Sequence, residues 1–192
     1  MKRFLFFMAL LCIWCISFNS VKAVSNAELQ DTSRFEHIVS KGDTGGGDGK
    51  YIELSTLRDI STDARTKSIE TKIYVVLPSS DLIREYTIRY DYNLNYSFAN
   101  LVAKMPEFKQ RFPDFSLNDI WNLKMDESGI VGTVKAQQDY TLNGESKPTQ
   151  PGYKGYEYVT FLTPTDFDFE SYHVANRVFK KVFGIFYDDV SR

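Results

Sequence analysis

Few residues of this sequence have side chains suited to metal or nucleophilic chemistry. There are two histidines, His37 and His173, and they stand far apart in the chain. Glu170 and His173 have the Glu-x-x-His spacing of di-iron helices, but such a site needs two of these pairs and two further glutamates. We therefore predict no metal and no cofactor, and we interpret His173 as a histidine on the solvent-facing side of a helix.

The spacing of serine and lysine does not indicate covalent catalysis either. Beyond residue 23 the chain has neither a Gly-x-Ser-x-Gly motif nor a Ser-x-x-Lys pair, the arrangements that activate serine in two classes of hydrolase. The 25 acidic residues could still supply two carboxylates for general acid–base hydrolysis. We expect a non-catalytic protein with no assigned catalytic residue, and we keep a carboxylate-based hydrolase as an alternative.

The first 23 residues have the three parts of an export signal. Lys2 and Arg3 precede an apolar run of about 13 residues, and the segment closes at Ala23 with side chains that a signal peptidase accepts before its cut. A membrane-spanning helix needs roughly 20 apolar residues. We predict a signal peptide over 1–23, a secreted or periplasmic protein, and no transmembrane segment after signal removal. An uncleaved anchor would leave the domain in the same compartment.

Removal of this segment changes the composition of the chain. The full chain has 192 residues and a formal charge of −2, with 23 basic and 25 acidic residues. Both cysteines and three basic residues lie before residue 24, so the remaining 169 residues carry 20 basic and 25 acidic residues, a charge of −5, and no cysteine. This excludes a disulfide-stapled fold, a thiolate metal site and a basic nucleic-acid-binding protein, and we expect no nucleic-acid partner.

Tyrosine is the most distinctive residue of the composition, with 12 copies. Four tyrosines alternate with polar residues along one expected strand, and we interpret them as a core face rather than a binding platform: Tyr86, Tyr90, Tyr92 and Tyr96. Tyr153 and Tyr156 follow a loop rich in turn-forming residues that contains Lys147. Since exposed loops often carry recognition, we predict Tyr153, Tyr156 and Lys147 as a binding site for a protein or glycan partner.

The elements that must position these residues follow from periodicity. We expect a flexible Gly-rich leader over 24–49 and a single α+β domain over 50–192. Period-two alternation predicts a strand over 86–96, and a hairpin is predicted from 121–125 and 130–136. Apolar residues spaced by three and four predict a helix near 97–112 and a long C-terminal helix near 166–186. The predicted fold is an antiparallel sheet of about five to seven strands, covered on one face by these two helices.

The functional expectation combines export, small size and missing catalytic motifs. We expect an exported, non-catalytic binding or interaction module of the cell envelope or exterior, of accessory, adhesin-like or inhibitor type. One alternative is a carrier of a small apolar ligand, with a cavity under the C-terminal helix. The other alternative is the carboxylate-based hydrolase, which requires two facing acids and a raised pKa on one of them.

Overall fold

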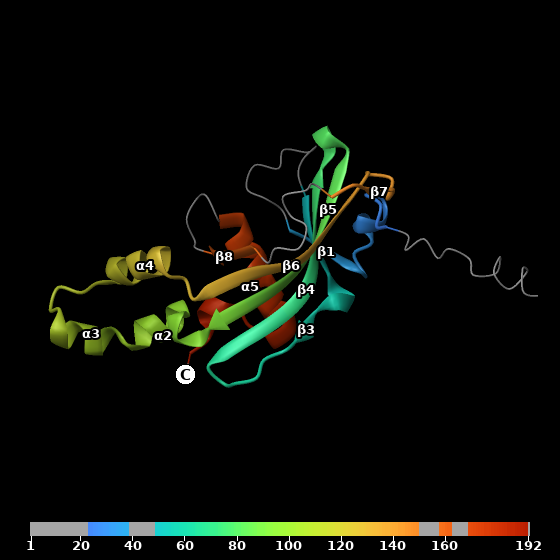
Figure 1. Ribbon diagram of the computed structural model, residues 1–192. Coiled ribbons are helices and arrows are strands. Elements are labelled where there is room, and N and C mark those ends of the chain that lie inside the picture. Colours follow the sequence, from blue (N-terminus) through green and yellow to red (C-terminus); the bar gives the residue numbers. More distant parts are fainter. Residues whose placement is uncertain (1–22, 39–48, 150–157, 163–168, 192) are drawn as a thin grey trace, which may run out of the picture.

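The computed structural model describes residues 23–38, 49–149, 158–162 and 169–191 (Figure 1). They form one curled antiparallel sheet and four α-helices, which confirms the predicted α+β class. The strands are β1 (Phe35–Ile38), β2 (Gly49–Glu53), β3 (Arg58–Asp59), β4 (Thr66–Leu77), β5 (Leu82–Asn93), β6 (Ile130–Tyr140), β7 (Ser146–Lys147) and β8 (Tyr158–Leu162). The helices are α2 (Phe98–Ala103), α3 (Met105–Arg111), α4 (Leu117–Asp126) and α5 (Phe169–Phe183). Short 3₁₀ turns are η1 (Glu28–Gln30), η2 (Leu54–Thr56), η3 (Pro78–Ser80), η4 (Leu94–Tyr96) and η6 (Tyr187–Asp189).

The centre of the sheet is the β4–β5 hairpin. The two strands pair over their full lengths, from Thr66 opposite Asn93 to Leu77 opposite Leu82. The strand order is β1-β2-β4-β5-β6-β7, with β3 also paired to β4 and β8 also paired to β6. The β5–β6 register shifts between Thr87 and Ile88, which marks a β-bulge. The predicted strand over 86–96 therefore exists, but it begins at residue 82 and gives way to η4 after residue 93.

The sheet buries side chains on both of its faces. Successive side chains of a strand point to opposite faces, so the neighbours Ile73 and Tyr74 belong to two different cores. The first core joins strand residues to buried residues of α5, among them Ala175, Val178 and Phe179. The second core joins the other face to the segment before β2 through Leu29, Phe35, Tyr51, Tyr74, Val76, Ile83 and Tyr140.

The expected flexible leader is wrong for its first part. Residues 23–38 contain η1 and β1, and β1 pairs with β2 from Phe35 opposite Glu53 to Ile38 opposite Lys50. The backbone N–H of Asn26 also donates to the carbonyl of Leu142 at 2.9 Å. This segment is ordered because Leu29 and Phe35 cover an apolar sheet face that would otherwise meet water. The Gly-rich run itself, 39–48, lies outside the described residues.

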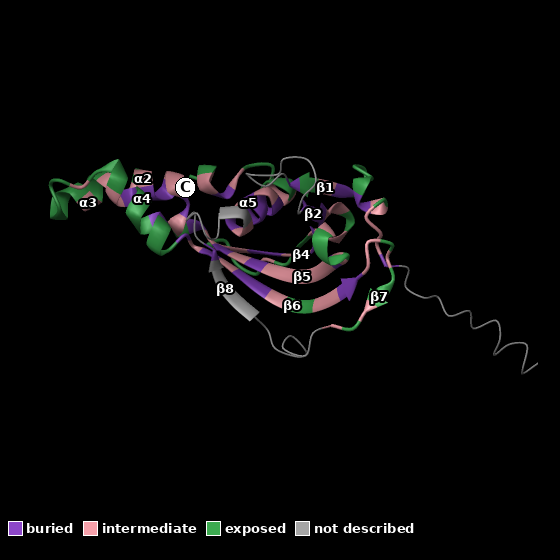
Figure 2. Cartoon of the chain, turned by 90° about the horizontal axis from the view of Figure 1, so that it is seen from above, coloured by how far each residue is buried: buried purple, intermediate pink, exposed green. Residues whose placement is uncertain are grey.

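The region predicted as a sheet-covering helix near 97–112 does not lie on the sheet. It forms α2 and α3, which continue through α4 as a projection that we call the arm, residues 98–126 (Figure 1). In Figure 2, α5 lies along the curled sheet, whereas α3 and most of α4 extend beyond it and carry exposed residues. The C-terminal helix is described from Phe169 to Phe183, and the residues directly before it, 163–168, are outside the described part.

The strand predicted over 121–125 is wrong, because these residues belong to α4. Ser116 and Asp119 form a capping box at its start: the Asp119 carboxylate accepts hydrogen bonds from the backbone N–H and hydroxyl of Ser116, both at 2.7 Å. The alternation that suggested a strand came from Trp121, Leu123 and Met125, which are all exposed. Because none of the three is buried, their spacing of two does not indicate a strand with one buried face.

Among the described residues, no helix is long and apolar enough to cross a membrane.

Candidate functional site

Of the three residues predicted to bind a partner, the structure describes Lys147. Lys147 lies in β7, where its ammonium donates to the carbonyl of Asp81 and lies 3.5 Å from the Asp81 carboxylate. These contacts tie β7 to the turn between β4 and β5. Tyr153 and Tyr156 lie outside the described residues. Lys147 is therefore already engaged within the chain, and its grouping with the two tyrosines stays a prediction.

Two of the four tyrosines of the long strand lie in the core. Tyr90 and Tyr92 are buried, whereas Tyr86 in β5 and Tyr96 in η4 are half-buried. The Tyr92 ring packs against Phe179 with centroids 4.9 Å apart, and its hydroxyl donates to the carbonyl of Ala175 at 2.8 Å. The interpretation as a core face is thus confirmed for Tyr90 and Tyr92, and Tyr92 links β5 to α5.

The histidine predicted on the solvent-facing side of a helix is more buried than the sequence suggested. His173 is half-buried, and its pKa is lowered by burial and by the positive charge of Arg177. Asn176 is buried. Within the described ranges, no group of three His, Cys, Asp or Glu residues could hold a metal ion.

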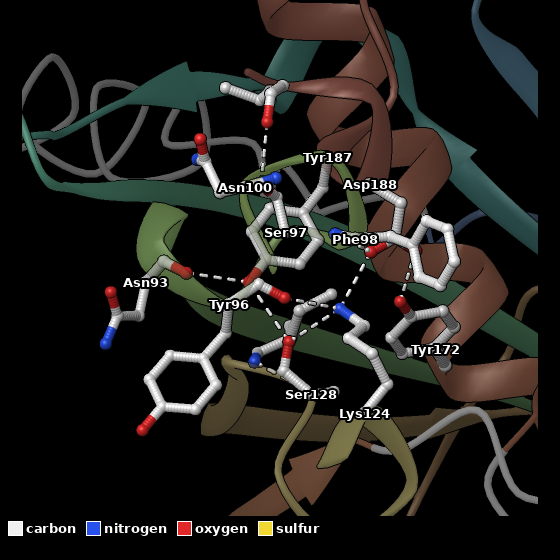
Figure 3. Close-up of polar contacts among 12 residues, drawn as sticks. Asn93, Tyr96, Ser97, Phe98, Asn100, Lys124, Ser128, Tyr172, Tyr187 and Asp188 are labelled. Carbon is white, nitrogen blue, oxygen red and sulfur yellow. Dashed lines mark hydrogen bonds and ion pairs between the residues drawn. The ribbon is translucent and has the colours of Figure 1, made fainter. Parts of the chain in front are cut away.

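The least expected feature is a buried lysine at the base of the arm (Figure 3). The side chain of Lys124, on α4, is only 1% exposed. Its ammonium donates to the carbonyls of Tyr96 at 2.8 Å and Ser128 at 2.9 Å, and it lies 2.7 Å from a carboxylate oxygen of Asp188 in η6. All three donor positions of the ammonium thus have partners, as a buried charge requires.

Asp188 receives contacts from three elements, which makes it the centre of this cluster. One carboxylate oxygen accepts from Lys124 and from the backbone N–H of Phe98 at 3.2 Å. The other oxygen accepts from the hydroxyl of Tyr172 on α5. Ser97, next to the start of α2, donates to the carbonyl of Val190 at 2.6 Å. The segment 187–190 therefore contacts both ends of the arm as well as α5.

Tyr187 closes the same cluster from the sheet side. Its hydroxyl lies 2.7 Å from the carbonyl oxygen of Asn93 and 3.0 Å from that of Ser128, and the Lys124 ammonium lies 4.7 Å from the centre of its ring. Gly129 has a φ of +78°, and a Cβ there would overlap the Tyr187 hydroxyl and Tyr96. A glycine is therefore required where the chain leaves the arm and enters β6.

The electrostatics of this cluster suit support rather than catalysis. Burial lowers the pKa of Lys124, and the neighbouring Asp188 carboxylate opposes that shift. Burial raises the pKa of Tyr172 and Tyr187, and the charge of Asp188 raises both further. Lys124 and Tyr187 have no side-chain surface open to a substrate, because both are almost completely buried. We define the Lys124 cluster as Lys124, Ser128, Tyr172, Tyr187 and Asp188; its contacts join the base of the arm to α5 and η6.

The arm itself carries the main exposed apolar surface of the described chain. Five of the seven exposed large hydrophobic residues lie on it: Phe112, Leu117, Trp121, Leu123 and Met125. Phe112 is 62% exposed and Trp121 is 50% exposed, although the Trp121 ring also contacts Phe98 at a centroid distance of 5.3 Å. Leu117, Trp121 and Met125 stand four residues apart on α4, so they form one ridge along the helix. Exposed apolar clusters of this kind mark interaction surfaces.

The sequence contains a signal for α4 that conflicts with the strand predicted over 121–125. Ser116-x-x-Asp119 is a capping-box pattern that precedes apolar residues, and it predicts a helix start at residue 117. The helix would have placed Leu117, Trp121 and Met125 on one face. No comparable signal identifies Lys124, because its partners Tyr96, Ser128 and Asp188 come from separate segments.

Comparison of the chain with protein-family models, curated proteins and solved structures finds no match in any of the three.

Proposed function

We propose that this chain is an exported, non-catalytic interaction module of the cell envelope or exterior, and that the arm is its docking surface. One observation carries the proposal: a helical projection held at its base by a buried ion pair presents Phe112 and the Leu117–Trp121–Met125 ridge to solvent. Exposed apolar side chains cost free energy in water, and a partner that covers them recovers it. Tyrosine, tryptophan and methionine contacts are enriched at such interfaces.

The placement of the ridge on a supported projection favours binding. An interaction surface gains affinity when it is ordered before the partner arrives, because less conformational entropy is lost on association. The Lys124–Asp188 ion pair and the Ser97–Val190 hydrogen bond anchor the two ends of the arm to the same C-terminal segment. This anchoring supports a docking role, because it sets the direction in which the ridge faces.

The acidic residues offer no comparable support for hydrolysis. A carboxylate-based hydrolase needs one acid with a raised pKa. Among the described residues, the carboxyl groups with a resolved shift all have a lowered pKa: Asp31, Asp59, Asp81 and Asp119. Hydrogen bonds from nearby serines or from the backbone of Leu142 are the leading causes. A group held ionised in this way is not suited to act as the general acid.

The alternative of a carrier with a cavity under α5 gains no specific observation. In the described part of this layer, Ala175, Val178 and Phe179 are buried against the strands, and the rings of Tyr92 and Phe179 are in contact.

Export remains part of the proposal and has its own test. Mass spectrometry of the protein recovered from the host's exported fraction should give a chain that begins at Val24; a cytoplasmic, full-length product would contradict it.

The docking role is tested by capture of partners from the host's envelope fraction. The wild-type chain should retain one or more proteins or glycans that Trp121→Ser and Leu117→Ser variants lose by at least about tenfold in affinity, the equivalent of roughly 1.4 kcal/mol. Ile60→Ser is the matched control, because Ile60 is an exposed apolar residue outside the arm. Equal capture by the wild type and both arm variants would exclude the arm as the docking surface.

A further inference from the structure

The arm lacks enough neighbours to bury its own apolar side chains. Of the large apolar residues between 98 and 126, Leu101 and Ile120 alone are buried. Near its base the arm is two helices thick, since α2 lies beside α4, and α3 extends from α2 toward the tip (Figure 1). Helices bury their apolar stripes by packing on another layer, and two helices side by side leave their outer faces without such a layer. A second pair of helices could supply that layer.

The size of the arm matches a complete protein interface. A specific interface of standard size uses roughly 20 to 30 residues on each side. The arm, residues 98–126, has a comparable length and projects from the sheet, so a partner can reach it without meeting the body of the protein. A partner of similar dimensions could therefore cover the ridge and Phe112 together.

The charges of the arm are divided between its two sides. Lys109 and Arg111 are exposed at the end of α3, and the acid on that helix is Glu107. The α4 side carries the exposed acids Asp126 and Glu127, with Asp114 before the helix. Its one basic residue, Lys124, is buried and paired with Asp188. The exposed charge is thus positive on α3 and negative on the α4 side.

This division makes the arm complementary to a second copy of itself. We propose that the arm of one chain packs against the arm of a second copy, with α3 of each facing α4 of the other around a twofold axis. In that arrangement Lys109 and Arg111 face acids of the second copy, while the two Leu117–Trp121–Met125 ridges are covered together. A twofold contact uses the same patch on both chains, so one complementary surface is sufficient. This inference rests on the proposed docking role of the arm and names its partner.

The test is charge reversal followed by mixing. Wild-type protein from the exported fraction should sediment as a dimer whose dissociation constant rises at least about tenfold in a Lys109→Glu, Arg111→Glu variant and in an Asp114→Lys, Asp126→Lys variant. An equimolar mixture of the two variants should recover the dimer, because each supplies the charge that the other needs. Recovery also shows that both variants are folded. Ile60→Ser should dimerise like the wild type.

Two outcomes would overturn self-pairing. One is a wild type that stays monomeric up to the highest concentration at which it is soluble. The other is a dimer that neither reversal weakens, which would place the contact elsewhere. If the wild type is monomeric but still captures an envelope component in a Trp121-dependent way, self-pairing is wrong and the proposed docking function stands. If Trp121→Ser alters neither capture nor dimerisation, both proposals fail.

Discussion

The ammonium of Lys124 lies 2.7 Å from a carboxylate oxygen of Asp188, and this pair joins α4 to the C-terminal segment inside the protein. Lys124 is 1% exposed, whereas Asp188 retains 29% of its side-chain surface. If the pair is broken, water can therefore hydrate the carboxylate of Asp188 more readily than the ammonium of Lys124. Substitution of each partner in turn should change the free energy of unfolding by different amounts.

Asp188→Asn should destabilise the protein by about 3 kcal/mol, because it leaves the Lys124 charge buried without its counter-ion. Lys124→Met should cost less, about 1 to 2 kcal/mol, since Asp188 can be hydrated and keeps its bonds from Phe98 and Tyr172. Urea unfolding measures both. Glu70→Gln is the control, because its partner Arg58 is 68% exposed and such surface pairs contribute at most about 1 kcal/mol. Equal losses for Asp188→Asn and Glu70→Gln would contradict the buried-pair argument.

Gly129→Ala should destabilise the protein more than Gly184→Ala. Both glycines have a φ of +78°, so each alanine incurs a conformational cost of about 1 to 2 kcal/mol. The added Cβ at residue 129 also lies 3.0 Å from the carbonyl oxygen of Asn93 and overlaps Tyr187, which raises the expected loss to about 2 to 4 kcal/mol. At residue 184 nothing lies within 4 Å. Thermal unfolding midpoints that fall equally would show that the arm base has room to adjust.

Ile120→Ala and Leu117→Ala should separate stability from interaction on a single helix. Ile120 is fully buried, so its truncation should cost about 2 to 4 kcal/mol in urea unfolding. Leu117 is 52% exposed, so its truncation should change stability by less than about 0.5 kcal/mol while weakening dimerisation or capture. A large stability loss for Leu117→Ala would mean that the ridge is part of the folded core rather than a docking surface.

The stability of the protein should fall as the pH rises above 10. Burial raises the pKa of six tyrosines: Tyr74, Tyr90, Tyr92, Tyr140, Tyr172 and Tyr187. For Tyr140 the pKa rises from 10.0 to about 12. Below pH 10 the folded and unfolded chains both hold these protons; above it the unfolded chain loses them while the folded chain keeps them, so the free energy of unfolding decreases.

Spectrophotometric titration of tyrosinate in the near ultraviolet checks this prediction. Only part of the tyrosine content should ionise reversibly near pH 10, and the rest should ionise together with loss of the native circular dichroism signal. Ionisation of every tyrosine in one step near pH 10 with the fold intact would contradict the burial of these hydroxyls. A Tyr140→Phe variant should unfold at a slightly higher pH, since it removes one of the groups that ionise preferentially in the unfolded chain.

Local periodicity accounts for the parts of the fold that the sequence predicted. Alternation of polar and apolar residues around Tyr90 and Tyr92 identified the long strand, because a strand with one covered face must alternate. Apolar residues spaced by three and four identified α5, because that spacing lines one side of a helix. The same method failed at residues 121–125, where the apolar side chains are exposed and their order has no link to a buried face.

The sequence by itself determined the α+β class, the long β5 strand and the C-terminal helix, because each depends on neighbours within a few positions of one another. Tertiary structure alone decided that residues 98–126 leave the sheet as an arm and that Lys124 is buried at its base. A lysine is buried only where counter-charge and carbonyl oxygens replace its water, and these come from Tyr96, Ser128 and Asp188, which only the folded chain brings together. The exposure of the Leu117–Trp121–Met125 ridge has the same origin, because whether an apolar stripe is covered depends on what packs beside it in the folded chain.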